Sequence, residues 1–230
     1  MAEATEPGRR LHRLAVEIAA LAQNGLTYAN KGAGGRRPGP DSVANRYEVA
    51  RYRRLQEISA ELMSITSGVD AAEFHYEIAA QTGHATPKVD VRGALFDPDG
   101  KVLLVRERID NRWTLPGGWA DALDSPTEAV TREFAEEAGL KVRAARLAAV
   151  YDGFRRNAHP AAPFHIYKMF FLMERLDDAV PTAGLDEETT AVDFFALDAL
   201  PELSRRRTSA EQLHRLHQHH LDPALPADVD

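Results

Sequence analysis

The sequence predicts an α+β protein, in which a mixed β-sheet sandwiched between helices follows a small all-helical N-terminal module. Apolar residues recur at helical spacing in the first third of the chain. After Pro87 the pattern changes to β-branched runs separated by turn residues, and Ser125 opens a strongly capped helix within that region. We expect a disordered tail over 1–8, a helical domain over 9–82, a sheet-containing domain over 83–220 and a tail over 221–230.

The composition is that of a globular protein. The 230 residues are 44% hydrophobic and 27% charged, with a formal net charge of −7 and no cysteine. The lack of cysteine excludes a disulfide framework, a thiolate zinc site and a cysteine nucleophile. The longest apolar helical stretch, Ala15–Ala22, is too short to cross a bilayer, and Met1–Arg10 lacks the apolar core of a signal peptide. We therefore expect a cytoplasmic protein with no membrane contact, and the acidic balance argues against nucleic acid as a partner.

The first predicted helix has one apolar face. Residues Leu11–Ala22 show the spacing of an amphipathic helix, and Gly25 is expected to end it with a left-handed cap. The glycine-rich run 32–40 is interpreted as a linker. Phosphate binding is the alternative for this run, but it follows a helix rather than a strand, and the Lys-Ser/Thr of a phosphate loop is missing.

Two further helices complete the N-terminal module. The second fits Val43–Met63 and the third fits Ala71–Gln81, where Asp70 and Glu73 have the spacing of a capping box. A small helical module with apolar stripes usually packs on something. We expect its partner to be either its own sheet-containing domain or a second copy of itself.

Strand patterns begin near Val89. The stretch Val89–Leu95 and the run Val102–Val105 flank Asp97–Gly100, whose Pro and Gly are typical of a tight turn, so these strands are predicted to form a hairpin. A C-terminal helix fits Ser209–His220. The later strand candidates are Leu147–Tyr151, Ile166–Met173 and Ala191–Phe195.

The helix that begins after Ser125 carries a cluster of acids. Its apolar stripe occupies one face, while Glu133, Glu136 and Glu137 lie on another. Carboxylates so close repel one another, and Arg132 cannot neutralise all three. Mg²⁺ or Mn²⁺ is the natural counter-charge, because both prefer oxygen ligands.

A glycine pair before this helix strengthens the metal interpretation. Taken alone, glutamate runs on helices are typical of an ordinary solvated face. Gly117 and Gly118 permit a tight backbone, however, so a main-chain carbonyl can approach the same cation. Between Gly118 and Leu140, six acids face a single arginine, so most of the net negative charge of the chain lies in this segment.

The same residues resemble the Nudix box, Gly-x5-Glu-x7-Arg-Glu-U-x-Glu-Glu-x-Gly-U, where U is a bulky aliphatic residue. Gly118, Arg132 and Gly139 stand at the matching positions. There are two departures: Asp124 replaces the first Glu, and Phe134 fills an aliphatic slot. The resemblance implies that Asp124 helps to hold the loop and Arg132. It also implies a Nudix-type mixed sheet.

The resemblance covers roughly residues 10–218 and includes the helical N-terminal region of one Nudix subgroup. It implies metal-dependent hydrolysis of the pyrophosphate bond of a nucleoside diphosphate linked to another moiety, of the ADP-ribose or CDP-choline type, with release of a nucleoside monophosphate. It also implies a homodimer formed through the N-terminal helices. Two alternatives stay open: a non-catalytic nucleotide-sugar sensor and an RNA-processing Nudix hydrolase.

The resemblance also implies a set of site residues. The metal ligands would be Glu133, Glu136, Glu137 and the backbone of Gly118. The catalytic groups would be Glu136, Glu137 and Arg132, with the general base either a box glutamate or an acid of a later loop. The candidates in that loop are Glu187 and Glu188, and the structural positions of the box are Gly117, Gly118, Asp124 and Gly139.

Substrate contacts are expected mainly from basic and aromatic residues outside the box. Side chains of this kind can meet phosphate, ribose or a base. The histidines of the C-terminal helix are better interpreted as part of a solvated amphipathic helix than as a metal site. The candidates for substrate binding are Arg106, Arg108, Arg112, Phe154, Arg155, Arg156, His159, Phe164 and Lys168.

Overall fold

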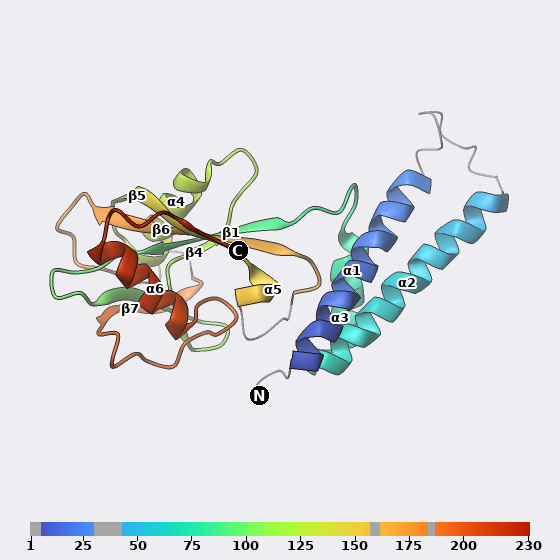
Figure 1. The fold of residues 1–230 in the computed structure, drawn as a ribbon, viewed down its shortest axis with the longest axis horizontal. Helices are drawn as coiled ribbons and strands as arrows, with labels where there is room; N and C mark the ends of the chain where they lie inside the picture. The colour runs from blue at the N-terminus through green and yellow to red at the C-terminus, as the bar shows by residue number, and fades with distance from the viewer. Residues whose placement is uncertain (1–5, 30–42, 157–161, 184–186) are drawn as a thin grey trace. The chain divides into compact units, whose positions relative to one another are not determined.

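The computed structural model describes residues 6–29, 43–156, 162–183 and 187–230. The chain forms two compact units, one made of residues 1–87 with 158–165 and the other of 88–157 with 166–230. Figure 1 shows helices in the first unit, and strands flanked by helices in the second. The fold class is therefore the predicted α+β arrangement with an N-terminal helical region.

The helical unit contains α1 (Glu6–Ala29), α2 (Val43–Ser67) and α3 (Ala71–Ala80). The predicted end of α1 at Gly25 is wrong, because the helix continues through this residue. A Cβ atom at Gly25 would lie 2.3 Å from the ring of Tyr52. The glycine is therefore a site of close contact between α1 and α2, not a cap.

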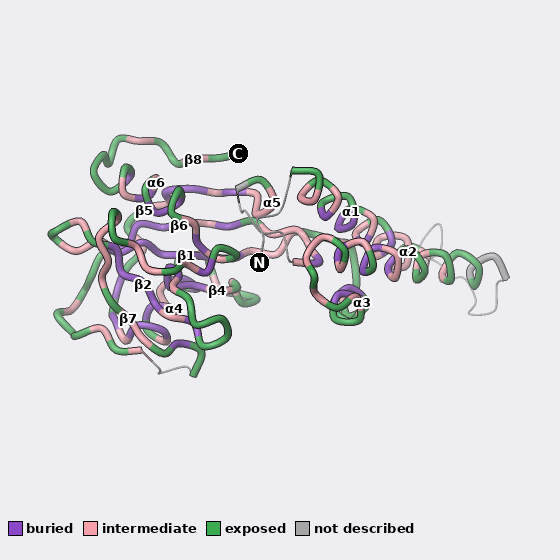
Figure 2. The backbone as a smooth tube through the Cα atoms, turned by 90° about the horizontal axis from the view of Figure 1, so that it is seen from below, coloured by how far each residue is buried: buried purple, intermediate pink, exposed green. Residues whose placement is uncertain are grey.

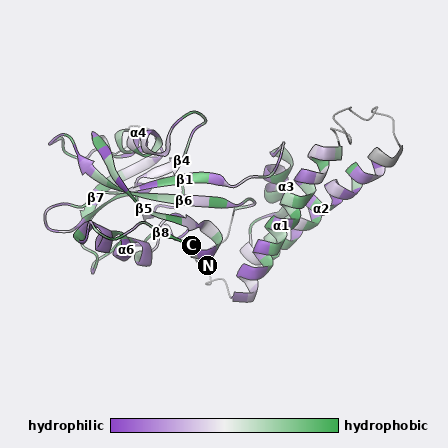
Figure 3. Ribbon diagram, turned by 45° about the horizontal axis from the view of Figure 1, so that its top comes forward, coloured by the Kyte–Doolittle hydropathy of each residue, from purple (hydrophilic) through white to green (hydrophobic). Residues whose placement is uncertain are grey.

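Small and apolar side chains fill the helical unit, and Figure 3 shows hydrophobic and hydrophilic residues sharing both long helices. The predicted tail over 1–8 is wrong from Glu6 onward, where α1 begins. Asp70 caps α3 by accepting a hydrogen bond from the backbone N–H of Ala72, at 2.9 Å, without the reciprocal bond of a capping box. The predicted linker over 32–40 lies outside the described residues.

The second unit contains two sheets, with strand orders β4-β1-β6-β5-β8 and β3-β2-β7. The larger sheet is mixed, since β1 runs parallel to β6 and antiparallel to β4. Figure 2 shows that β1 and β2 are largely buried, and that β6 is buried along much of its length. The elements are β1 (Lys88–Ala94), β2 (Val102–Glu107), β3 (Trp113–Thr114), β4 (Gly117–Trp119), α4 (Pro126–Ala138), β5 (Val142–Asp152), α5 (Gly153–Arg156), β6 (Ile166–Arg175), β7 (Thr189–Phe195), α6 (Ala210–Leu221) and β8 (Asp228–Val229).

Helices cover both faces of the larger sheet. Figure 1 shows α4 on one side of it and α6 on the other. Neighbouring residues of β6 point to opposite faces, so Phe171 joins the core with Phe134 of α4, while Phe170 joins the core with Leu213 of α6. This arrangement sets β1 and the start of β4 beside α4. We call the Gly117–Gly118 segment at the start of β4 the glycine turn.

The predicted hairpin is wrong, although its turn is confirmed. Gly100 takes a left-handed conformation, with φ of 78°, and its N–H donates to the carbonyl of Asp97 at 3.0 Å. Beyond the single bridge between Phe96 and Val102, β1 and β2 separate into different sheets. The reason is that β2 finds its partners in β7 and β3 instead.

The prediction of a frayed C-terminal tail is also wrong. Strand β8 pairs in parallel with β5. Asp228 in β8 accepts two hydrogen bonds from Arg215, at 2.5 and 2.6 Å, and one from Tyr151 at 3.0 Å. These contacts hold the pKa of Asp228 well below its ordinary value, with the Arg215 hydrogen bonds as the main cause. These contacts of the C-terminal segment could not be predicted from sequence spacing, because the partners are up to 77 residues apart in the chain.

Among the described residues, no helix is both long enough and apolar enough to span a membrane. The cytoplasmic location stays a prediction.

Candidate active site

Helix α4 is fixed at both ends by local sequence. Ser125 is its N-cap and accepts a hydrogen bond from the Glu128 backbone at 3.3 Å, while the Glu128 carboxylate accepts one from the Ser125 backbone at 2.9 Å. Pro126 occupies the first turn, where its missing N–H costs nothing. Gly139 ends the helix in the left-handed conformation, with φ of 65°. The strong cap predicted at Ser125 is thus confirmed, in the form of a capping box, and the helix places its glutamates at defined positions.

The glycine turn requires glycine at position 117 and makes a close contact with α4 at position 118. Gly117 has φ of 139°, and a Cβ atom there would lie 2.0 Å from the carbonyl oxygen of Val91. A Cβ atom at Gly118 would lie 3.0 Å from Oε1 of Glu133. The turn therefore lies directly against β1 on one side and against a carboxylate of α4 on the other.

The three glutamates of α4 lie around this turn. Glu137 is 3% exposed, and its Oε2 accepts a hydrogen bond from the N–H of Gly117 at 2.8 Å. Glu133 abuts Gly118 and is also largely buried. Glu136 is more exposed and pairs with Arg132 at 2.9 Å. Two carboxylates thus lie on the glycine turn, and the third is held beside them by an arginine.

Arg132 is shared among several acids. Its guanidinium lies 3.1 Å from Glu133, 2.9 Å from Glu136 and 3.4 Å from Asp124. The shorter side chain of Asp124 therefore still reaches the arginine. A further acid, Asp121, lies 3.5 Å away. One cation shared in this way leaves the site with an excess of negative charge.

Burial further disfavours the charged form of the carboxylates in this site. It raises the pKa of Glu137 to about 8, against the opposing charge of Arg92. Burial likewise raises the pKa of Glu133. In the described part of the chain, no three acids or histidines are already gathered as a ligand set. The donor set nevertheless fits a hard divalent cation, because it offers carboxylate oxygens together with backbone carbonyls of the turn.

Cation binding is expected to depend on pH. Glu137 holds a proton below about pH 8, and a ligand must release its proton to bind a cation. Mn²⁺ affinity should therefore rise between about pH 6 and pH 8 and level off above that range. Titration calorimetry in buffers of different ionisation enthalpy should show proton release on binding, and Glu137→Gln should remove this component. A Mn²⁺ affinity that stays constant over this range would contradict the assignment of Glu137 as a ligand.

The predicted substrate residues have different neighbours in the structure. Arg106 donates to the hydroxyl of Thr190 at 3.0 Å, and its guanidinium lies 5.9 Å from the Trp113 ring. Arg112 is exposed and pairs with Glu202, and Arg155 is exposed and lies 3.5 Å from Asp152. The side chain of Arg156 and all of His159 lie outside the described residues. Phe164 belongs to the helical unit, and Phe154 lies in α5.

The loop that carries the two candidate base residues is anchored to β2. The backbone N–H of Arg108 donates to the carbonyl of Glu188 at 2.8 Å, and its Nε donates to the carbonyl of Glu187 at 2.6 Å. The hydroxyl of Thr189 donates to the backbone carbonyl of Glu137 at 3.3 Å. Glu188 therefore directly precedes a residue bonded to α4, and its own side chain is exposed.

The histidines of α6 make packing and backbone contacts. The rings of His217 and His220 both lie against Phe96, at centroid distances of 5.3 and 4.7 Å. His219 is fully buried, and His214 contacts the carbonyl of Ala210. The solvated-helix interpretation is therefore wrong for His219, whose ring lies in the core, and it stays a prediction for the other three.

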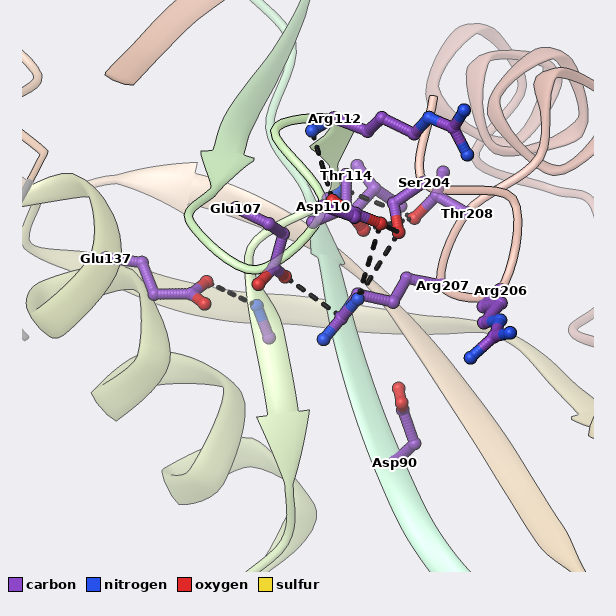
Figure 4. A network of polar contacts seen from close by, with 12 residues as sticks. Asp90, Glu107, Asp110, Arg112, Thr114, Glu137, Ser204, Arg206, Arg207 and Thr208 are labelled. Carbon is purple, nitrogen blue, oxygen red and sulfur yellow. Dashed lines mark hydrogen bonds and ion pairs between the residues drawn. The ribbon is translucent and has the colours of Figure 1, made fainter. Parts of the chain in front are cut away.

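Sequence reasoning missed a buried network of charged residues beside the glycine turn. Figure 4 shows Glu137 pointing to the backbone of the turn, and Arg207 lying between Glu107 and Asp110. Asp90 and Glu107 are both buried and lie near this arginine. Polar residues in alternation with valine along β1 indicate a solvated face when only the sequence is considered, so no sequence signal identified the network. Its members are Asp90, Arg92, Glu107, Lys168 and Arg207.

Comparison with protein families decides the identity of this fold. The model of the NUDIX domain matches residues 86–216. The chain belongs to the Nudix family. This Nudix chain is 37% identical to the “Putative ADP-ribose pyrophosphatase YjhB” of Bacillus subtilis, over 88% of each protein. The family resemblance inferred from the box is therefore confirmed.

Two solved Nudix structures resemble the chain over different shares of its length. An ADP-ribose pyrophosphatase from Streptococcus suis is 38% identical, with a TM-score of 0.56, and covers 63% of this chain and all of its own. A structure described as UDP-X diphosphatase is 27% identical, with a TM-score of 0.57, and covers 97% of this chain and 99% of its own. The second match therefore includes the N-terminal helical region as well as the Nudix domain.

Proposed function

We propose that this Nudix hydrolase cleaves the pyrophosphate bond of a nucleoside diphosphate linked to a second moiety, with ADP-ribose as the first candidate substrate. The observation that carries the proposal is the placement of the buried Glu137 and Glu133 against the Gly117–Gly118 turn. The names of the two relatives near 38% identity support the choice of ADP-ribose. Cleavage would give AMP and ribose 5-phosphate.

The residues of α4 and the turn would hold Mg²⁺ or Mn²⁺. Glu133, Glu136, Glu137 and the carbonyl of Gly118 supply oxygen ligands. Such cations neutralise phosphate oxygens and lower the pKa of coordinated water. Arg132 keeps Glu136 and Glu133 oriented on the face of the helix that meets the turn. The metal identity is part of the proposal.

A base is needed to take a proton from the attacking water. A box glutamate or Glu188 fills this role in the proposal. Glu188 is supported by its place next to Thr189, which is bonded to the end of α4. Arg106 and Arg155 are the described cations proposed to meet the phosphates or ribose.

A substrate panel tests the proposal. The full chain is incubated with ADP-ribose, CDP-choline, a UDP-sugar and short RNA, each with Mg²⁺ or Mn²⁺, and the release of monophosphate is measured. We expect turnover of at least one nucleoside diphosphate derivative, fastest with ADP-ribose. Tight nucleotide binding without turnover would instead support the sensor hypothesis, and turnover of RNA alone would support an RNA-processing enzyme.

The helical unit is proposed to form a homodimer. Leu14, Leu21 and Tyr28 of α1 are 46%, 61% and 57% exposed. They stand seven residues apart, so they lie along one side of the helix. A row of large apolar side chains in water is typical of a helix that packs against another helix. The second helix in this proposal is α1 of another copy.

Breaking this row should change the oligomeric state. Leu21→Asp places a charge in the middle of the proposed interface, which should weaken the dimer by at least about tenfold. Light scattering coupled to size-exclusion chromatography should report a dimer for the wild type and a monomer for the variant. Leu176→Asp, at a position 60% exposed in the Nudix unit, is the matched control and should remain dimeric. A monomeric wild type would contradict the proposal.

A further inference from the structure

A charged pair lies buried under the glycine turn, on strand β1. Asp90 and Arg92 are 6% and 4% exposed, and they alternate with valines that point to the opposite face. Transferring two charges from water to the protein interior costs free energy, and apolar residues of similar size often serve stability equally well. Core formation alone therefore does not explain the pair.

The contacts of Arg92 fix its own orientation and hold the backbone at Leu115, just before the glycine turn. Its Nε and Nη2 donate to the two carboxylate oxygens of Asp90, at 2.9 and 3.1 Å, and its Nη1 donates to the carbonyl of Leu115 at 3.1 Å. The next backbone N–H, that of Gly93, donates to the carbonyl of Pro116 at 3.0 Å. The carbonyls of the two residues before Gly117, Leu115 and Pro116, thus accept hydrogen bonds from Arg92 and Gly93.

The charge of Arg92 also reaches the glutamates of α4. It lowers the pKa of Glu137 and of Glu133 against the effect of burial. Arg92 is paired in β1–β4 register with Gly117, the residue whose N–H contacts Glu137. A single side chain therefore acts on the backbone of the turn and on the carboxylates that face it.

The other end of the pair is braced by β6 and the turn at 204–208. Asp90 lies opposite Lys168 in the parallel register of β1 and β6. Lys168 is 2% exposed and donates to the carbonyls of Arg206 and Arg207, at 3.1 and 2.5 Å. Burial lowers the pKa of Lys168 to about 8, and Asp90 opposes this effect. Asp90 is thus bonded to Arg92 and also feels the positive charge of Lys168, and both influences favour its ionised form.

We propose that Arg92, oriented by Asp90, is a positioning residue for the cation site. It fixes the backbone from Leu115 to the glycine turn and places a positive charge beside Glu137. It does not contact the substrate. The inference rests on the proposed function only in taking the glutamate cluster of α4 as the cation site.

Mn²⁺ binding to the full chain without substrate tests the inference, by electron paramagnetic resonance or calorimetry. Arg92→Lys keeps the charge and loses the planar fork, and Asp90→Asn keeps the shape and loses the partner charge. The double variant Asp90→Asn/Arg92→Met removes both charges, so neither is left buried alone. We expect each variant to bind Mn²⁺ about 10- to 100-fold more weakly than the wild type, as is usual when groups supporting metal ligands are replaced.

A matched control separates positioning from general damage. Arg143→Met removes an exposed arginine of β5 that pairs with Glu174, and it should bind Mn²⁺ like the wild type. Near-ultraviolet circular dichroism and thermal unfolding verify the fold of every variant. A purely structural role for the pair predicts that the double variant, once folded, recovers wild-type Mn²⁺ affinity.

The outcomes distinguish this inference from the proposed function. Wild-type Mn²⁺ affinity in folded Arg92→Lys, Asp90→Asn and the double variant would overturn the inference, even if the enzyme hydrolyses ADP-ribose. Weaker Mn²⁺ binding in these variants would support it, even if none of the substrates is hydrolysed. A wild-type chain that binds no Mn²⁺ would overturn it as well.

Discussion

Replacing Glu137 by Gln should reduce the turnover of the nucleoside diphosphate substrate by about 10³-fold, equivalent to about 4 kcal/mol of activation free energy. Glutamine keeps the shape of the side chain, and its carbonyl oxygen can still accept the hydrogen bond from Gly117. It lacks the negative charge that a divalent cation requires. Steady-state rates with saturating substrate and a wide range of Mg²⁺ concentrations measure the effect.

The fold of this variant should be intact. Because burial raises the pKa of Glu137 to about 8, the carboxyl group is already neutral at pH 7 without a cation, and a neutral amide costs little. The raised pKa of Glu137 contributes stability at low pH, and this contribution is lost as pH rises through 8. The free energy of unfolding of Glu137→Gln should therefore lack this pH-dependent decrease. Glu174→Gln, at an exposed position near the end of β6, is the control for activity. Wild-type turnover in Glu137→Gln would exclude Glu137 from the cation site.

Replacing Gly117 by Ala should abolish activity and lower the free energy of unfolding by about 3 kcal/mol. The residue has φ of 139°, and the added Cβ would lie 2.0 Å from the backbone oxygen of Val91. Backbone cannot move aside as a flexible side chain can, so the turn must leave β1. Chemical denaturation and turnover under the same buffer conditions measure both effects.

Gly100→Ala is the matched control for the Gly117 variant. Gly100 also has a left-handed φ, of 78°, but its nearest neighbour is the side-chain nitrogen of His217 at 3.3 Å. We expect a cost of about 1 kcal/mol from the strained backbone and no loss of turnover. Equal effects in the two variants would show that backbone strain, and not the contact with β1, explains the role of Gly117.

The sequence was most informative where structure is decided locally. The start of α4 could be predicted at the level of single residues, because Ser125, Pro126 and Glu128 interact within one turn. The Asp97–Gly100 turn could be predicted for the same reason. The spacing of Glu133 and Glu137 also placed them on a common side of the helix, which the structure shows against the glycine turn.

Features that depend on distant partners could not be predicted. Asp90 and Arg92 alternate with valine, a pattern typical of a half-exposed strand, yet Lys168 and the 204–208 turn cover them. Gly25 has the character of a helix end in the sequence, but α1 continues through it and there lies closely against Tyr52 of another helix. The order of the C-terminal segment likewise depends on Arg215 and on β5.

The predicted substrate residues also have some properties that the sequence reveals and others that it does not. Basic character could be recognised from the sequence, but the function of a surface arginine depends on which acid lies next to it. Arg112 pairs with Glu202, which is distant in the sequence, whereas the neighbour of Arg155 is the local Asp152. The box residues are easier to identify, because one helix and one turn contain all of them.

Product analysis of ADP-ribose hydrolysis is the most direct test of the central claim, that the glutamates and the glycine turn form a pyrophosphatase site. Phosphorus NMR and chromatography of the reaction with Mg²⁺ should show AMP and ribose 5-phosphate in equal amounts, and Glu137→Gln should show neither above background. Release of ADP and free ribose, or equal product formation by the wild type and Glu137→Gln, would contradict the account.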